Sequence, residues 1–481
     1  MNVRQGYAPA GRFLQSVGLD RRRQGALAIG LLWMVCALPS SATRSFIWEE
    51  GTNAEIARRV LDHGEFLLPQ VYGRPWAVKP SLLAWLIAGV DRITGQVDEF
   101  SAHLPSMLAA LAVALMIYRF GLRYLSLPAA FCAGLAFLFA PLVLQKLAIA
   151  EPDLVVTLLS FAAFLVWWSG AERGRVGLPR WLGAGPLLAI LVTAKGPQPA
   201  AFLALGACGW ILVRRSWRDI PGAALCLLLP AATILAWAIA AYRPGEESEW
   251  RAYMHLTVMP APLDYVVEQL RAALTALLQL LPMTLLLPFV LWPGQRPKDG
   301  VDVPPVQQAL ALYAVPCCLV LLFWPGSAGR YAMPAAPALA LLAGFAWDRP
   351  GPKLLARARR LVVGTIGALV LFQLVLVWVV MPVYANRFGA SRIDGRAIEA
   401  AMASAPAPAY TLWWPTNQLF YVHAPILFLD EAGIPGVTAP AWLLVTEGEL
   451  AKFSKLRPDL KTAIKLKTFS GPELMAVRVE P

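Results

Sequence analysis

Long apolar runs are the feature of this sequence that most constrains its fold. A membrane-spanning helix needs about 20 mostly apolar residues, and runs that approach or exceed this length recur up to residue 383. Only 15% of the residues are charged, against about 25% in soluble domains, and one large soluble core would not need so many separate runs. The sequence therefore predicts a polytopic α-helical membrane protein. We place about eleven transmembrane helices near residues 25–41, 102–120, 128–146, 152–170, 181–195, 199–213, 221–242, 271–292, 305–324, 333–347 and 361–383.

The basic residues follow the positive-inside rule. They gather in short segments between alternate apolar runs, from Arg21–Arg23 before the first run to the basic segment 349–360 before the last. Because cytoplasmic loops are enriched in Lys and Arg, this pattern accounts for the net charge of +12 without nucleic-acid binding and predicts a cytoplasmic N-terminus. An alternative interpretation is that the first run and the small residues 40–42 form a cleaved signal peptide, but losing that helix would disturb the alternation of charge.

The character of the sequence changes near residue 384. From here to the end, short apolar runs alternate with segments of helical pattern, which is typical of a small α/β domain. With an odd number of helices before it, this domain is expected outside the cytoplasm. We therefore predict a transmembrane domain at 1–383, with catalytic external loops at 42–101 and 243–270, and a periplasmic α/β domain at 384–481.

Two classes of chemistry have no support in the sequence. The six cysteines are found within apolar runs, without CxxC or Cys/His ligand spacing, so neither a thiolate metal site nor a redox function is expected. There is no phosphate-binding loop of the Walker type and no dinucleotide fingerprint. An ATP-driven pump is therefore not expected.

A charged segment follows the first apolar run and contains Glu49, Glu50 and Lys79. Ionisable groups at a membrane are costly and commonly mark a functional site. Glu49 is the first candidate for a general base, with Glu50 as its neighbour; two close carboxylates raise each other's pKa or share a metal. Alternatively, both acids favour the start of a helix at 53–62 through its dipole. Lys79 precedes a proline, which favours a turn; it is a candidate phosphate ligand or a lysine that reaches the lipid headgroups.

Further candidates lie at other expected external helix ends. Lys195 and Arg330 could each bind a phosphate or lipid headgroups, Tyr331 could donate to a phosphate oxygen, and Glu151 could orient an acceptor or form an ion pair. In the expected lid at 243–270, His255 is a weak candidate for a metal ligand. No cofactor is assigned from these residues, and a divalent metal stays open.

These motifs, taken in order, resemble those of the GT-C glycosyltransferases, and within them the aminoarabinose-transferase and protein-mannosyltransferase-like group. At five positions this sequence departs from the residue that is usual in the group, and these differences bear on the donor sugar and the acceptor. Glu49 stands where an aspartate is usual, Thr52 where an arginine is often found, Asn53 and Ala84 where tyrosines are usual, and Ser81 where a proline is usual. The matching segments are Glu49-Glu50, Ala54-Glu55-Ile56, Gly64-Glu65-Phe66 with Pro69, Lys79-Pro80-Ser81-Leu82, Glu151-Pro152, Lys195-Gly196-Pro197, and Arg330-Tyr331 with Pro334 and Pro337.

The resemblance implies an inverting glycosyltransferase of a bacterial inner membrane. Its expected partners are a polyprenyl-phosphate sugar donor, a membrane-proximal acceptor such as lipid A or another lipid-linked glycan, and membrane lipids. Transfer to a serine or threonine of a secreted protein is the first alternative. A transporter or flippase of lipid-linked sugars is the second, although it would place ionisable residues near mid-span, whereas these cluster at expected helix ends. A non-catalytic receptor or assembly protein is the third, in which the two acids would have no role.

Overall fold

The computed structural model describes residues 20–76, 79–242, 261–290, 304–323, 328–351, 353–412, 417–470 and 473–481. Within these ranges, six helices are long and apolar enough to cross a membrane, and seven if the bent pair α6 (Leu127–Leu138) and α7 (Pro141–Leu147) forms one span. The six are α2 (Arg21–Thr43), α5 (Glu99–Gly121), α8 (Asp153–Ala171), α11 (Ile220–Ala241), α15 (Pro305–Phe323) and α17 (Lys353–Val375), which continues through a π-helical turn into α18 (Met381–Val383). The chain is therefore a multi-pass membrane protein, and the predicted fold class is confirmed.

Every segment expected to span the membrane contains helix, but several helices are short or broken. The further helices α9 (Leu178–Lys195), α10 (Gln198–Arg214) and α16 (Ala336–Asp348) lie at three of these segments. The segment expected at 271–292 is divided between the end of α13 (Pro262–Gln279), a 3-10 turn and α14 (Leu287–Val290). Proline explains the breaks, because it lacks the backbone N–H that a helix interior needs: Pro141 follows the bend before α7, and Pro282 follows the end of α13.

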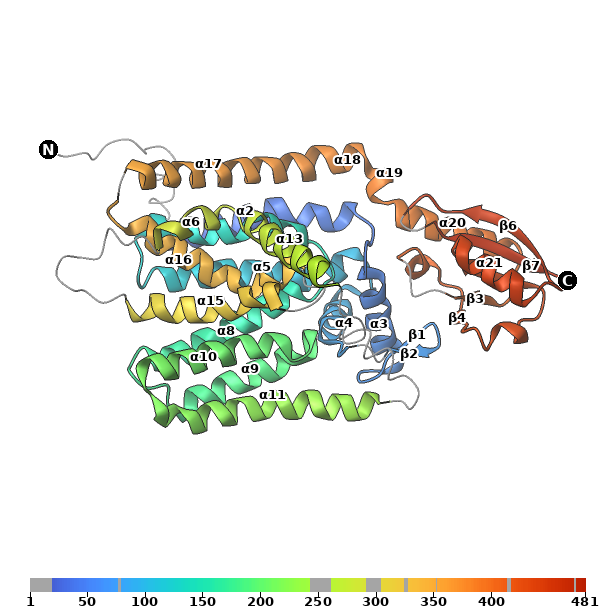
Figure 1. Cartoon of the computed structure of the whole chain (residues 1–481). Helices are drawn as coiled ribbons and strands as arrows, with labels where there is room; N and C mark the ends of the chain where they lie inside the picture. Colours follow the sequence, from blue (N-terminus) through green and yellow to red (C-terminus); the bar gives the residue numbers. More distant parts are fainter. Residues whose placement is uncertain are drawn as a thin grey trace.

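The helices form one bundle around α5, which packs against α2, α4 (Leu82–Thr94), α6 and α8 (Figure 1). On the other side of α8, Trp167 and Trp168 meet Trp210 of α10 edge to face, with ring centroids 5.8 and 5.6 Å apart. Such aromatic contacts add to the packing of apolar surfaces. These contacts hold α8 against α10.

A separate layer lies at one end of the bundle, between the helices and the C-terminal domain (Figure 1). It consists of α3 (Glu50–His63), the short hairpin β1 (Gln70–Val71) and β2 (Arg74–Pro75), and α4. The sequence predicted α3 at 53–62, whereas α4 lay within a segment treated as a loop. Gly64 ends α3 in the left-handed conformation, at φ 69°, which glycine adopts without steric cost.

The C-terminal domain begins with α19 (Ala385–Phe388) and α20 (Ala390–Ser404) and contains a mixed five-stranded sheet of order β4-β3-β5-β7-β6. In it, β3 pairs in parallel with β4 and β5, whereas β7 is antiparallel to β5 and β6. All five residues of the central strand β5 are buried, as expected for a strand covered on both faces. The elements are β3 (Ala409–Thr411), β4 (Ile426–Phe428), β5 (Ala441–Val445), α21 (Glu447–Leu456), β6 (Lys461–Lys467) and β7 (Met475–Glu480).

Candidate functional site

The candidate residues from distant parts of the sequence meet at the end of the bundle that faces the C-terminal domain. We call the set Glu49, Lys79, Glu151, Lys195, Arg330 and Tyr331, with Lys146 and Asp153, the charged site. Its members occupy the ends of elements: the residue before α3, the turn before α4, the break between α7 and α8, the end of α9, and the 3-10 segment Gly329–Ala335. Proline and glycine produce these ends. Gly196, for example, ends α9 directly after Lys195 at φ 77°.

Glu49 and Lys79 form the accessible part of the charged site. Lys79 Nζ lies 2.9 Å from Glu49 Oε2, and the Glu49 side chain is 63% exposed. The attraction of Lys79 lowers the pKa of Glu49 below its usual range, and the charges of Arg330 and Lys195 act in the same direction. Glu49 is therefore ionised at neutral pH and open to a reactant.

Glu50 faces the opposite way and is fully buried. Its Oε2 accepts from Arg44 Nη1 at 2.7 Å and from the Ile47 amide at 2.8 Å. Its Oε1 lies 2.8 Å from His103 Nε2 and accepts from the Ala150 amide at 2.7 Å. Burial favours the neutral acid, but His103 and Arg44 outweigh it and hold the pKa of Glu50 at about 2. The structure thus places Glu50 in a closed hydrogen-bonded cage, with no exposed surface.

The next part of the charged site alternates acids and lysines. Lys146 pairs with Glu151 and lies 3.9 Å from Asp153, which also pairs with Lys195. All but Lys195 in this group are buried. A buried ion pair is strongly destabilising to break, because one charge is left without a partner. This chain of charges therefore ties α7, α8 and α9 together beneath the accessible Glu49.

Arg330 and Tyr331 close the other side of the charged site. Lys195 Nζ lies 4.9 Å from the centre of the Tyr331 ring, within the range of a cation–π contact. Burial disfavours the charge on Arg330, but Asp153 and Glu151 raise its pKa all the same. Its Nε atom is buried and has no hydrogen-bond partner within the described part of the chain. Arg330 thus has a donor that an anionic ligand could use.

Sequence reasoning missed four residues that shape this region, namely Arg44, Trp48, His103 and Asp153. Lys146, five positions before Glu151, was not among its site candidates either. Lys146 Nζ lies 4.6 Å from the centre of the Trp48 ring, which connects the alternating charges to the turn that carries Glu49. Asp153 was visible in the Glu-Pro-Asp sequence at the start of α8. His103 lies in the middle of an apolar helix, and its contact with Glu50 gives no sign in the sequence.

The described ranges contain no group of three His, Cys, Asp or Glu side chains placed to hold a metal ion. Glu49 and Glu50 do not share a site, because one pairs with Lys79 and the other with Arg44 and His103. His255 and most of the expected lid at 243–270 lie outside the described residues.

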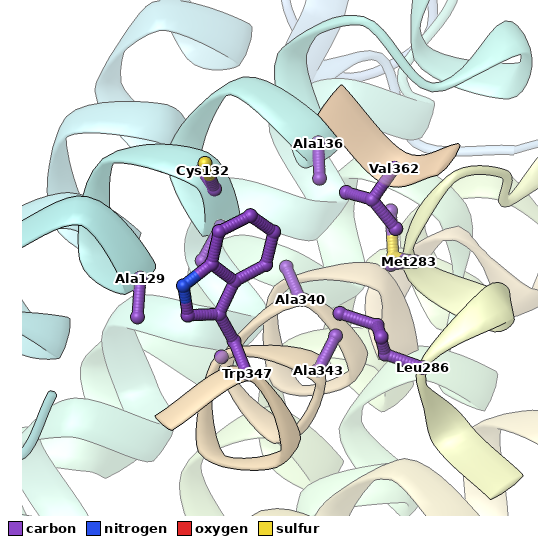
Figure 2. Close-up of a pocket in the computed structure, with 11 residues that line it drawn as sticks. Ala129, Cys132, Ala136, Met283, Leu286, Ala340, Ala343, Trp347 and Val362 are labelled. Carbon is purple, nitrogen blue, oxygen red and sulfur yellow. The ribbon is translucent and has the colours of Figure 1, made fainter. Parts of the chain in front are cut away.

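A crevice elsewhere in the bundle is of a different kind. It lies among α6, α16, α17 and the 3-10 turn at 283–285, and Trp347, Cys132 and Met283 project into it (Figure 2). None of its lining residues is charged. A phosphate would find no cation there, so the charged site is the better candidate for a functional site.

Comparison with known sequences connects the chain to enzymes that use lipid-linked sugars. Residues 78–242 match the sequence model of the family described as Dolichyl-phosphate-mannose-protein mannosyltransferase. A curated relative from Edwardsiella ictaluri, the undecaprenyl phosphate-alpha-4-amino-4-deoxy-L-arabinose arabinosyl transferase, is 27% identical over 344 residues. That match covers 66% of this chain and 57% of the relative, so the chain spans little more than half of that protein's length.

Comparison with solved structures concerns the fold. The apo crystal structure of ArnT from Cupriavidus metallidurans superposes with a TM-score of 0.69 at 16% identity, covering 94% of this chain and 97% of that one. The same protein bound to undecaprenyl phosphate gives a TM-score of 0.69 at 15% identity, with the same coverage. The likeness includes both the helical bundle and the C-terminal domain, so the two chains share one overall fold.

Proposed function

We propose that this chain belongs to the aminoarabinose-transferase and mannosyltransferase-like group of GT-C glycosyltransferases and that it moves a sugar from a polyprenyl-phosphate donor to a membrane-proximal acceptor. The observation that carries the proposal is the ionised, accessible Glu49 beside Lys79, with Arg330, Lys195 and Tyr331 in the same charged site. The names of the Edwardsiella relative and of the Cupriavidus structure, which was solved with undecaprenyl phosphate, support a lipid-phosphate donor.

The cations of the charged site suit the leaving group of this reaction. When the bond between the sugar and the phosphate breaks, the electron pair stays on the phosphate oxygen, and negative charge grows there. Lys79 and Arg330 can receive that charge, and the Nε–H of Arg330, which has no partner among the described residues, can donate to a phosphate oxygen. Donors positioned in advance stabilise such a transition state without reorganisation. Lys195, packed on Tyr331, would add to the positive field.

Glu49 is the proposed general base. It takes the proton of an acceptor O–H group while the acceptor oxygen attacks the anomeric carbon from the face opposite the phosphate. One carbon–oxygen bond forms as the other breaks, so the configuration at that carbon is inverted. General-base help of this kind typically contributes a factor of about 10² to 10⁴ in rate.

The pairing of Glu49 with Lys79 links donor binding to the strength of the base. Without donor, Lys79 holds the Glu49 pKa low and so makes it a weak base. A donor phosphate that attracts Lys79 weakens this pair, and the pKa of Glu49 then rises toward its usual value. The base becomes stronger when the leaving group is in place.

The assignment of Glu50 as a second catalytic residue is replaced in this proposal. We assign it to the support of the turn that carries Glu49, because all its hydrogen bonds go to protein groups inside the cage. Glu151 is likewise assigned to the buried part of the charged site, beneath Glu49, with Lys146 as its partner.

We further propose that the charged site and the C-terminal domain face the periplasm, with the N-terminus in the cytoplasm. The alternation of basic segments supports this orientation. Lipid A or another lipid-linked glycan is the proposed acceptor. A serine or threonine of a protein is the second candidate, favoured by the mannosyltransferase family that matches residues 78–242.

The test is sugar transfer by the purified protein in lipid nanodiscs, with radiolabelled undecaprenyl-phosphate aminoarabinose and polyprenyl-phosphate mannose as donors. Lipid A and a serine- and threonine-containing peptide serve as acceptors. We expect transfer by the wild type and a loss of about 10² to 10⁴-fold in Glu49→Gln. Glu431→Gln is the matched control, because Glu431 is exposed and pairs with Lys452 on the C-terminal domain. A wild-type protein that binds these donors and moves them across a bilayer, but transfers nothing, would overturn the proposal in favour of a flippase.

A further inference from the structure

We propose that Asn417, in the C-terminal domain, is a positioning residue for Glu49. The inference rests on the proposed role of Glu49 as general base. In this proposal, the C-terminal domain contributes a residue that holds the active-site turn in place.

Asn417 contacts the backbone on both sides of Glu49. Its Oδ1 accepts a hydrogen bond from the Gly51 amide at 2.9 Å, and its Nδ2 donates to the Trp48 carbonyl at 3.1 Å. An asparagine side chain offers one acceptor and two donors in a plane, so this single carboxamide satisfies both backbone groups. Glu49 is therefore held between two anchor points supplied by another domain.

The turn needs such support, because Trp48 has a left-handed backbone conformation with φ 53°. A residue with a β-carbon rarely adopts this conformation, because its Cβ atom crowds the following carbonyl oxygen, so it persists where the surroundings hold it. Trp48 is 52% exposed, and burial alone does not fix it. The hydrogen bond from Asn417 to its carbonyl and the contact of Lys146 with its ring supply the hold.

The approach of the two domains at this point is close. A Cβ atom added to Gly51 would lie 3.0 Å from both the Cα and the Oδ1 of Asn417. Glycine in the first turn of α3 thus allows the clamp to reach the backbone. Alanine would favour the helix but push Asn417 away.

Other contacts dock the domain independently of Asn417. The Ser45 amide donates to the Phe388 carbonyl at 2.9 Å, and the Tyr421 hydroxyl accepts from the Phe46 amide and donates to Glu99. The Phe46 ring also packs against Phe420, with centroids 4.9 Å apart. Because this seam would remain, loss of the Asn417 carboxamide is expected to loosen the Glu49 turn while the domain stays docked.

The position of a general base affects the chemical step most. A misplacement of about 1 Å can cost about 100-fold in rate. Asn417 contacts none of Lys79, Lys195, Arg330 or Tyr331 through its two hydrogen bonds, so donor affinity should change little. The expected signature is a fall in kcat at nearly constant KM for the donor.

The experiment compares Asn417→Ala and Gly51→Ala with Asn386→Ala, since Asn386 is an exposed asparagine on α19 of the same domain. In the transfer assay we expect both test variants to lose about 10 to 100-fold in kcat, with donor KM within about threefold, and the control to match the wild type. Hydrogen exchange of the 45–53 peptide is the readout that does not need activity. We expect faster exchange there in Asn417→Ala, where the Gly51 amide loses its acceptor.

The outcomes separate this inference from the proposed function. Wild-type transfer with unchanged kcat and unchanged exchange in Asn417→Ala would overturn the positioning role alone. An inactive wild type would overturn the proposed function, and faster exchange in Asn417→Ala would then still establish the clamp as a structural contact. A general loss of protection throughout the C-terminal domain, instead of at 45–53, would mean that Asn417 only maintains the fold.

Discussion

Glu49 and Glu50 are the same amino acid in adjacent positions, yet the regions around them are opposites. Around Glu49 the surface is open, and one lysine pairs with a carboxylate that is 63% exposed. Around Glu50 the protein is closed, with the carboxylate fully buried among Arg44, His103 and two backbone amides. The comparison shows that a pair of acids in a sequence need not act as a pair. The Glu49 carboxylate is exposed to a reactant, whereas the oxygens of the Glu50 carboxylate are hydrogen-bonded to other parts of the protein.

The buried Glu50 side chain connects the turn that carries Glu49 to the helix bundle. Glu50 joins the start of α3 to α5 through His103 and to the segment before α8 through Ala150. Arg44 joins the same carboxylate to the end of α2. The buried residue thus fixes the backbone, and its exposed neighbour stays open to a reactant.

The largest expected effect is the loss of the Glu50 carboxylate. In Glu50→Gln, Arg44 is left buried without its counter-ion, and breaking a buried ion pair costs about 3–5 kcal/mol. We expect a clear fall in Tm in lipid or detergent, measured by thermal unfolding, whereas Glu49→Gln should unfold near the wild-type temperature. A Glu50→Gln protein of wild-type Tm that no longer transfers sugar would reverse the comparison and make Glu50 the reacting acid.

The sequence could predict features that depend on local properties, but not contacts between residues far apart along the chain. The long apolar runs and the prolines were enough to locate the helices, because span length and helix breaking are local properties. The candidates Glu49, Lys79, Lys195 and Arg330 were found because they lie beside turn-forming residues at expected helix ends. The cage around Glu50 was not predictable, since His103 lies 53 positions away on an apolar helix. Asn417 is further still, at 366 positions from Gly51.

The elements that were misjudged have similar causes. Helix α4 was missed because it is short and follows a segment rich in glycine and proline. The expected span at 271–292 was treated as continuous because its composition is apolar, although Pro282 lies three residues after the end of α13. Composition indicated burial in the membrane, and the position of proline decided where the helix ended.

The next effect concerns pH and isolates the open region. Lys79 lowers the Glu49 pKa, so the ionised base should persist to pH values below the ordinary value for glutamate. Removing the charge in Lys79→Met raises that pKa in the donor-free enzyme, so the acidic limb of the kcat/KM profile, which reports the free enzyme, should move to higher pH. Donor affinity should also fall by about 10 to 100-fold, as for the loss of one charged hydrogen bond to phosphate.

The profile is measured as the transfer rate against pH at donor concentrations well below KM, with Lys452→Met as the control, because Lys452 pairs with Glu431 at the surface. An acidic limb that stays in place in Lys79→Met would show that the titration of Glu49 does not limit the reaction. A shift in Glu49 pKa without a change in donor affinity would assign Lys79 to the base and leave the phosphate to Arg330 and Lys195.

The last comparison is with Asp91, a buried carboxylate that has no ion pair among the described residues. Asp91 on α4 is 2% exposed, and neither carboxylate oxygen has a hydrogen-bond partner among the described residues. Burial raises its pKa to about 6, whereas Glu50, with its two cations, has a pKa of about 2. Since the pKa of Asp91 is raised on folding, its contribution to stability is present below about pH 3.8 and is lost as the pH rises through about 6.

Asp91→Asn removes this penalty at neutral pH, so it should raise the free energy of unfolding there by up to about 3 kcal/mol. The advantage over the wild type should shrink as the pH falls toward 4, where Asp91 is protonated in the folded protein. Thermal unfolding at pH 7.5 and pH 4 measures both, and Asp62→Asn, at an exposed position on α3, is the control. Equal stability of Asp91→Asn and the wild type at pH 7.5 would mean that Asp91 has a cation or water partner in the membrane-embedded protein. Asp91 would then be a buried acid with a partner, like Glu50, and the contrast between the two would not hold.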